Sequence, residues 1–291
     1  MAKTKSPKAD AKKAAKAERK AALAAETAVI AERRNALARA YELDAAAALA
    51  PFARWVAKAK TAGEPDLAVQ LEWVSSLNGE TPEKLALREW MESLLETNMA
   101  DVYGPDDWPA VQKTKRRELR EDNARFLFVY PAPDKENAPA QGSAKQQLPI
   151  AFVQYRFDEE AEALVVYCYE LQLAPEARRR GLGKFLMCAL ELLGKKAGMG
   201  GVMLTVQRSN TSARAFYAAC KYDDSCISPS KVDPWSDEEE YSYDILDKMW
   251  SPEAQAALQK HADEAKAEWA KEELQAHDAK QAHEYTASGN T

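Results

Sequence analysis

Two glycines at the start of a helix constrain this chain more than any other feature. Residues 178–184 read Arg-Arg-Arg-Gly-Leu-Gly-Lys and follow an apolar strand at 164–173. They open an amphipathic helix that carries Leu186 and Leu193 on one face. Glycine lets a ligand approach the backbone closely, and the first N–H groups of a helix have no partner within it. Together with the helix dipole and the arginines, this turn predicts a site for a phosphate or pyrophosphate.

The spacing of these glycines excludes two other phosphate-binding motifs. The chain has no Gly-x-x-x-x-Gly-Lys-Ser/Thr, so a P-loop nucleotide site is not expected. The third glycine of the dinucleotide-binding motif is also missing. The anion site must therefore belong to another class of protein.

Composition further limits the classes of protein to which this chain can belong. The 291 residues are 46% hydrophobic and 30% charged, which is typical of a globular protein. A net charge of −6 argues against a basic nucleic-acid binder, and no sequence-specific nucleic-acid contact is expected. Four Cys and three His lack metal-ligand spacing, so we expect no metal site and no disulfide framework. We also expect no signal peptide, no membrane-spanning helix and no membrane partner.

The two ends of the chain differ from its middle in charge. Residues 1–40 hold eleven Lys and Arg against four Asp and Glu, and residues 251–291 hold four Lys against eight acids. We expect a basic Ala/Lys-rich extension, helical or disordered, at 1–40 and an acidic helical tail at 251–291. The basic segment is either a solvated helix or a contact for the ribosome, the import machinery or nucleic acid. Between them, 41–250 is the expected folded domain, with a loop insertion at 131–149.

The middle segment alternates strand and helix patterns. A helix is expected from Thr81 to about Tyr103, where Gly104-Pro105 ends it, and a second, exposed helix over the charged residues 113–123. Further helices are expected to start at Gly181 and Asn210. The expected strands are 67–77, 125–130, 150–157, 164–173, 202–206 and 241–246.

Arg-x-x-Gly-x-Gly between a strand and a helix resembles the acetyl-CoA signature of the Gcn5-related N-acetyltransferase (GNAT) superfamily. Within it, the chain is similar to the NatD family of histone N-terminal acetyltransferases over residues 65–247. The runs that carry this similarity are 167–173, 179–186, 202–206, Thr97-Asn98-Met99, Arg156-Phe157-Asp158, Asp223-Asp224-Ser225, Ser228-Pro229-Ser230 and Ser242-Tyr243-Asp244-Ile245-Leu246.

The resemblance implies an α/β fold. A central mixed sheet, mostly antiparallel, is splayed at the acetyl-CoA strand and flanked by helices. It implies acetyl transfer from acetyl-CoA to the α-amino group of an N-terminal serine. The implied substrates are histones H-four and H-two-A, which begin Ser-Gly-Arg-Gly, and the implied locations are the cytoplasm and the nucleus.

The resemblance also assigns catalytic roles. A terminal amine has a pKa of about 7.7–8.0 and arrives largely protonated, so a general base assists its attack. Glu170 is the implied base, next to Tyr169, whose ring would partly desolvate it; the alternative is a solvated strand glutamate. Tyr217 either protonates the leaving thiolate or simply packs on its helix face.

Further residues are implied to bind the donor. The backbone of Leu171, Gln172 and Leu173 would pair with the pantetheine arm and polarise the thioester carbonyl. Asn210 and Tyr217 stand where GNAT enzymes commonly contact coenzyme A. The pyrophosphate would be held by Arg178, Arg179, Arg180, Gly181, Leu182, Gly183 and Lys184.

The acceptor peptide is implied to lie among aromatic and acidic side chains. Asp158 is the expected partner of the arginine at position three of the substrate. The acidic residues 237–240 either steer a basic histone tail or form a solvated loop. The implied peptide-binding residues are Tyr103, Trp108, Asp158, Tyr167, Tyr169, Thr205 and Tyr243.

Two rival hypotheses remain at this point. One keeps the enzyme and changes the acceptor to another protein terminus, a lysine side chain or a small amine, which the acetyl-CoA motif does not distinguish. The other is a non-catalytic GNAT-like module that the basic N-terminus attaches to ribosomes or nucleic acid. The intact glycine turn and Glu170 favour the enzyme.

Overall fold

The computed structural model describes residues 7–59, 65–132, 148–233 and 241–288, and it divides into two units, Met1–Glu42 and Leu43–Thr291. The first unit is one long helix, α1 (Pro7–Tyr41), whose alanine-rich sequence has high helix propensity. Its described side chains are mostly exposed. Most of the expected loop insertion at 131–149 and the acidic run 237–240 lie outside the described residues.

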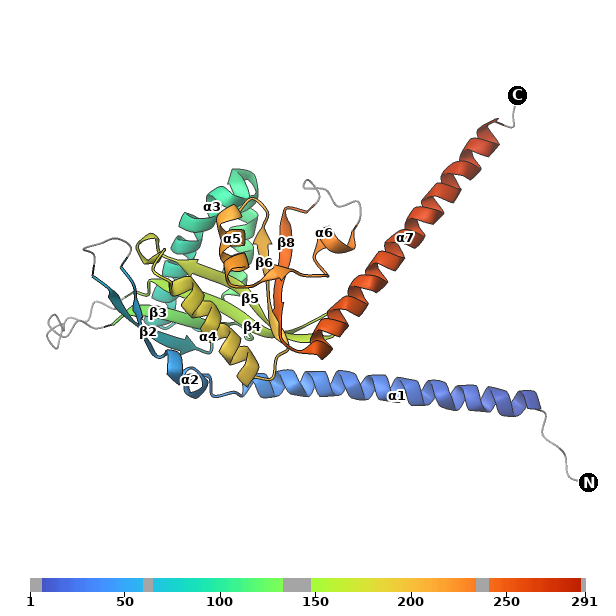
Figure 1. The fold of residues 1–291 in the computed structure, drawn as a ribbon, viewed down its shortest axis with the longest axis horizontal. Helices are drawn as coiled ribbons and strands as arrows, with labels where there is room; N and C mark the ends of the chain where they lie inside the picture. The colour runs from blue at the N-terminus through green and yellow to red at the C-terminus, as the bar shows by residue number, and fades with distance from the viewer. Residues whose placement is uncertain (1–6, 60–64, 133–147, 234–240, 289–291) are drawn as a thin grey trace, which may run out of the picture. The chain divides into compact units, whose positions relative to one another are not determined.

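The second unit is built on one mixed sheet (Figure 1). Its eight described strands follow the order β1-β2-β3-β4-β5-β6-β8-β7, and every neighbouring pair is antiparallel except β5 with β6. This confirms the expected fold class. The strands are β1 (Arg54–Ala57), β2 (Leu67–Val74), β3 (Arg125–Pro131), β4 (Ala151–Glu160), β5 (Ala163–Leu173), β6 (Gly201–Gln207), β7 (Asp223–Asp224) and β8 (Tyr243–Met249).

The sheet opens between its two parallel strands. β5 pairs with β6 only from Val166 to Cys168, yet β5 continues to Leu173 along β4. The register of β4 against β5 shifts at Gln154, so that Tyr169 is an extra residue in β5. A bulge of this kind bends a strand and re-aims its side chains. The expected splay therefore begins at Tyr169.

Helices pack against this sheet. The largest apolar face belongs to α4, which packs on β4, β5 and β6 and buries Leu186, Leu190 and Leu193 completely. The helix α5 begins after Asn210, whose side chain accepts from the Ala213 N–H. The described helices of this unit are α2 (Ala45–Ala48), α3 (Pro82–Glu118), α4 (Leu182–Lys196), α5 (Thr211–Ala219), α6 (Pro229–Val232) and α7 (Pro252–Ser288), with short 3-10 turns at Ala50–Phe52 and Pro175–Ala177.

The helix α3 differs from the sequence expectation. It does not end at Gly104-Pro105 but kinks there, because Gly104 adopts φ 80 and ψ 165. Its second limb then starts at Pro105, a residue suited to the first position of a helix.

The helix expected over 113–123 is wrong in its bounds, and its exposure is confirmed only for its outer face, because its inner face packs on the domain. The second limb of α3 ends at Glu118, and Trp108 and Leu119 on its inner face are buried. Lys115 lies between these two on the same helix face, and its side chain is only 19% exposed. A segment that reads as uniformly charged therefore turns one lysine inward.

The acidic helix α7 joins the core through its first turns. Leu258 is fully buried, and Ala254 is 8% exposed. Both belong to a cluster with Val165 of β5 and Met203 of β6. This part of α7 is integral to the domain rather than solvated. None of the described helices is long and apolar enough to cross a membrane.

We predict that Leu258→Ala lowers the free energy of unfolding by about 2–5 kcal/mol, because it leaves a cavity among fully buried neighbours. Urea denaturation followed by circular dichroism measures the change. Leu23→Ala on the exposed face of α1 is the control, since Leu23 is 63% exposed and its loss should change stability by about 0.5 kcal/mol or less. Equal midpoints for the two variants would contradict the packing of α7.

Candidate active site

A cavity of about 750 Å³ occupies the opening between β5 and β6. It is lined by the end of β5, the glycine turn, the end of β6, α5 and the kinked helix α3. The expected site residues that line it are Tyr103, Tyr169, Glu170, Leu171, Gln172, Leu173, Arg178, Arg179, Gly181, Gly183, Lys184, Thr205, Asn210 and Tyr217.

The glycine turn presents backbone donors to this cavity. Gly181 has a left-handed conformation, with φ 82, and no side chain caps the helix that follows. The first intrahelical bond runs from the Phe185 N–H to the Gly181 carbonyl, so the N–H groups of residues 182–184 have no partner within the helix. A Cβ on Gly183 would lie 3.0 Å from the ring of Phe216, which explains the glycine there.

Two of the three arginines of this turn line the cavity, and the third points away from it. Arg178 and Arg179 line the cavity, and Arg179 has a positive φ of 62. Arg180 does not line it. Its guanidinium donates to the carbonyls of Lys58 and Pro65 at 3.4 and 3.3 Å. The side chain of Leu182 is fully buried, so only the backbone of this residue is available to a ligand.

Glu170 lies at the start of the splayed part of β5 and is 7% exposed. One of its carboxylate oxygens, Oε1, is 2.8 Å from the Nζ of Lys115. The other, Oε2, accepts a hydrogen bond of 2.8 Å from the Nε2 of Gln172. Glu170 is therefore not a solvated strand glutamate, because both of its oxygens are held by side chains.

Lys115 carries a positive charge at this position. Its Nζ is also 3.3 Å from the carboxylate of Glu118. Burial disfavours the ammonium, but the carboxylates of Glu170 and Glu118 outweigh it, so the pKa of Lys115 lies above its ordinary value. The cluster holds two carboxylates and one ammonium.

A chain of hydrogen bonds joins Glu170 to the glycine turn. Asn98 on α3 donates to the side-chain carbonyl of Gln172 at 2.8 Å and to the Leu173 carbonyl at 3.2 Å. Arg178 donates to the Asn98 side chain and, at 3.3 Å, to the same Leu173 carbonyl. The side chain of Gln172 therefore positions Glu170, a role separate from that expected for its backbone.

Tyr217 reaches the cavity from α5. Its ring is 9% exposed and packs edge-on against Phe216 and Tyr222, at centroid distances of 5.1 and 5.9 Å. Burial raises the pKa of Tyr217 well above its ordinary value. The hydroxyl is therefore protonated at neutral pH and able to donate. Tyr217 both packs and faces the cavity, so its two expected roles are compatible.

Aromatic and acidic side chains adjoin the cavity through Tyr169 and Thr205. The hydroxyls of Tyr167 and Thr205 are 2.6 Å apart, and burial raises the pKa of Tyr167 to about 12. The rings of Tyr167 and Tyr169 are 5.2 Å apart. Asp158 is close enough to help raise the pKa values of Tyr169 and Glu160, each of which burial raises first.

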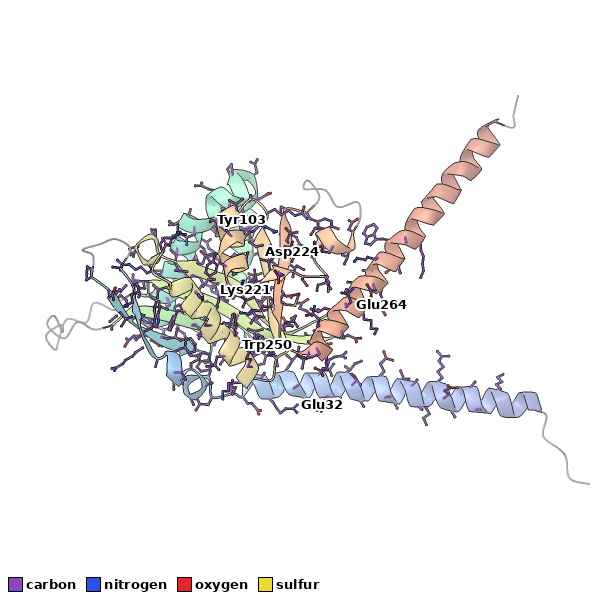
Figure 2. The ribbon with its side chains drawn as sticks, viewed as in Figure 1. Glu32, Tyr103, Lys221, Asp224, Trp250 and Glu264 are labelled. Carbon is purple, nitrogen blue, oxygen red and sulfur yellow. The ribbon has the colours of Figure 1, made fainter. Side chains whose placement is uncertain are left out.

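The remaining expected peptide-binding residues are dispersed. Tyr103 lies on α3 and lines the cavity (Figure 2), with its ring 6.1 Å from that of Trp108. Trp108 is 8% exposed and does not line the cavity, and its Nε1 has no hydrogen-bond partner among the described residues. Tyr243 packs edge-on against Tyr241 at 6.4 Å. Asp158, Tyr167 and Tyr243 also lie outside the lining.

Sequence reasoning missed three groups of the site. Lys115 was hidden in a charged run, although its spacing from Trp108 and Leu119 follows one helix face. Asn98 lies in one of the runs that carry the family similarity, but no role was assigned to it. Phe216, on the distant helix α5, packs against Gly183 of the turn, and no local sequence pattern predicts that contact.

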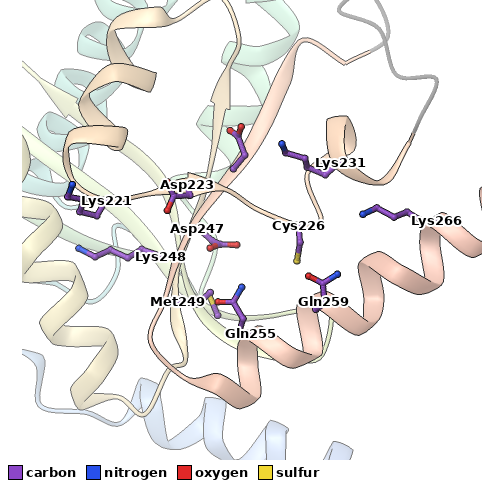
Figure 3. A pocket seen from close by; sticks show the side chains of 11 residues that line it. Lys221, Asp223, Cys226, Lys231, Asp247, Lys248, Met249, Gln255, Gln259 and Lys266 are labelled. Carbon is purple, nitrogen blue, oxygen red and sulfur yellow. The ribbon is translucent and has the colours of Figure 1, made fainter.

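A second cavity, of about 450 Å³, lies between β7, β8, α6 and the first half of α7 (Figure 3). Apart from Cys226 and Met249 it is lined by lysines, aspartates and glutamines, and it contains none of the expected site residues. Over the described ranges, no group of three or more His, Cys, Asp or Glu side chains is arranged to hold a metal ion.

Solved structures with a related arrangement are distant in sequence. The PaiA N-acetyltransferase of Thermoplasma acidophilum in complex with coenzyme A is 18% identical, with a TM-score of 0.42 over 62% of this chain and 99% of its own. NAA60 of Arabidopsis thaliana in complex with a bisubstrate analogue is 13% identical, with a TM-score of 0.40 over 62% and 100%. The NatC complex bound to Gag peptide and CoA is 11% identical, with a TM-score of 0.38 over 62% and 99%.

One family model matches the middle of the chain. The model described as "Acetyltransferase (GNAT) family" matches residues 87–222. This range contains most of α3, the strands from β3 to β6, the glycine turn and α5. The match supports an acetyltransferase of the GNAT type over residues 87–222, a little less than half of the chain.

Proposed function

We propose that this chain transfers an acetyl group from acetyl-CoA to the α-amino group of a protein that begins with serine. The proposed substrates are histones H-four and H-two-A, which begin Ser-Gly-Arg-Gly. The observation that carries the proposal is that the buried Glu170 carboxylate and the glycine turn line one cavity, next to a group of tyrosines and acids.

The described residues fit acetyl-CoA. The N–H groups at the start of α4 suit its pyrophosphate, and Arg178, Arg179 and Lys184 add positive charge in the same cavity. Beyond Cys168, the edge of β5 that faces β6 has no strand partner among the described residues, so backbone groups on that edge are available to the pantetheine arm. The Leu173 carbonyl is not one of them, because Asn98 and Arg178 already donate to it. When bound, acetyl-CoA supplies the thioester that the amine attacks.

The side chains around Glu170 supply the proton transfers. Glu170 accepts a proton from the acceptor ammonium, directly or through one water. A backbone N–H between Leu171 and Leu173 that points away from β4 stabilises charge on the thioester oxygen. Tyr217 is protonated and lines the same cavity, so it can donate a proton to the departing thiolate.

The acceptor side supports a peptide with an early arginine. Asp158 and Glu160 lie near the rings of Tyr167 and Tyr169, and these carboxylates suit ion pairing with a guanidinium. The Tyr169 ring itself is already covered by the chain's own Arg156, at 4.1 Å from the ring centroid. The Tyr167 and Thr205 hydroxyls provide partners for a serine side chain. The net charge of −6 favours encounter with basic histone tails. The basic residues 1–40 are the proposed ribosome contact.

We predict that the protein acetylates a peptide beginning Ser-Gly-Arg-Gly-Lys at its free amino terminus and leaves the same peptide with a blocked terminus unmodified. Fragmentation mass spectrometry locates the added acetyl group. Lysine acetylation on the blocked peptide would move the activity to side chains. Transfer to neither peptide, with acetyl-CoA still bound, would remove the histone assignment and keep the family.

A second prediction concerns the donor site. Gly183→Glu should weaken acetyl-CoA binding by about 100-fold or more, because the side chain meets Phe216 and its carboxylate opposes the pyrophosphate. Calorimetric titration measures the affinity. Lys196→Glu, which places the same charge at the exposed end of α4, should leave the affinity near that of the unmodified protein. Unchanged binding by Gly183→Glu would overturn the assignment of the turn.

A third prediction concerns the base. Glu170→Gln keeps the shape of the side chain and removes its basicity, so kcat with the free-terminus peptide should fall by about 10²–10⁴-fold. Acetyl-CoA affinity, measured on the same preparation, should stay nearly constant. A variant that retains normal kcat would show that another group, or water alone, accepts the proton.

A further inference from the structure

We propose that Lys115 is a positioning residue for acetyl transfer: its ammonium holds the Glu170 carboxylate in place and keeps it charged inside the cavity. This inference rests on the proposed role of Glu170 as the base. It concerns a residue on α3 to which the resemblance assigns no role.

The first support is burial. A carboxylate that is 7% exposed is costly to keep ionised unless a cation or several donors stabilise it. Lys115 approaches Oε1 of Glu170 at 2.8 Å, and Gln172 is the other side-chain donor to this carboxylate among the described residues. The lysine side chain is itself 19% exposed, so solvent does not replace it easily.

The second support is that Lys115 is held from both sides. Its Nζ bridges Glu170 and Glu118, at 2.8 and 3.3 Å. A lysine that merely occupied the place of the acceptor amine would need to leave when substrate arrives. The Glu118 carboxylate, one helical turn along α3, instead fixes the ammonium beside Glu170.

The third support is charge balance. Two carboxylates and one ammonium leave one negative charge, which an arriving terminal ammonium neutralises. The other titratable groups that face Glu170 are Tyr103 from α3, Cys168 from β5 and Tyr217 from α5, and burial raises the pKa of each. These three groups stay neutral near pH 7, so Lys115 is the cation of this cluster.

The test is the pH dependence of kcat with the free-terminus peptide. Lys115→Met keeps the length of the side chain and removes its charge, so Glu170 should become protonated more readily. The acid limb of the profile should therefore move up by about 1–3 pH units. Lys115→Arg should return the limb toward its original position, and Lys113→Met, on the exposed face of the same helix, should leave the profile unchanged.

Glu118→Gln should shift the acid limb of the profile in the opposite direction. This second variant provides the test if Lys115→Met does not fold. Removal of this second carboxylate reduces the negative charge near Glu170, so the acid limb should move to lower pH. If the two variants only lost packing, their melting temperatures would fall, but their acid limbs would not move in opposite directions. Acetyl-CoA affinity should be unchanged in both variants.

Three results would overturn the inference. The first is an unmoved acid limb in folded Lys115→Met. The second is a higher kcat/KM in that variant, which would mean that Lys115 competes with the acceptor amine. The third is acetylation of Lys115 itself, detected by intact-mass measurement after incubation with acetyl-CoA. If Glu170→Gln retains normal turnover, the role of Glu170 as the base is wrong. That result is distinct from the three above, which overturn only the positioning role of Lys115.

Discussion

The site depends on the point at which β5 and β6 stop pairing. Residues 166–168 hold the two parallel strands together, and the bulge at Tyr169 turns the rest of β5 away along β4. If pairing continued to Leu173, the backbone edge of β5 would be occupied and no cavity would form there. Parallel pairing is expected to continue while both strands are extended, so its early end is the feature that opens the fold to a ligand.

This opening creates an electrostatic problem that α3 resolves. The alternation along β5 turns the Glu170 side chain into a nearly closed space. An isolated carboxylate there would cost several kcal/mol, and it is stable only with a cation and hydrogen-bond donors beside it. The kink at Gly104 directs the second limb of α3 so that Lys115 and Glu118 reach this space, while Asn98 on the first limb supports Gln172. One break in one helix therefore serves both the proposed base and its partner.

Much of the donor side could be predicted because it is local in sequence. The strand expected at 164–173 is β5 (Ala163–Leu173), and the helix expected from Gly181 is α4 (Leu182–Lys196). Periodicity and glycine spacing act over a few residues, so they locate such elements well. The direction of Arg180 could not be predicted, because it follows from the positive φ of Arg179 and from carbonyls of the distant residues Lys58 and Pro65.

The acceptor side shows why the rest could not be predicted from the sequence. The side chains proposed for it come from β4, β5, β6, β8 and α3, and the sheet brings only some of them to the cavity. Charge patterning identified 113–123 as a solvated face, since a lone inward lysine carries no signal of its own until its carboxylate partner is placed. A contiguous turn can thus identify the donor, whereas recognition of the acceptor is spread over non-local contacts. For that reason, one donor motif can serve enzymes with different acceptors, and the acceptor must be tested with peptides.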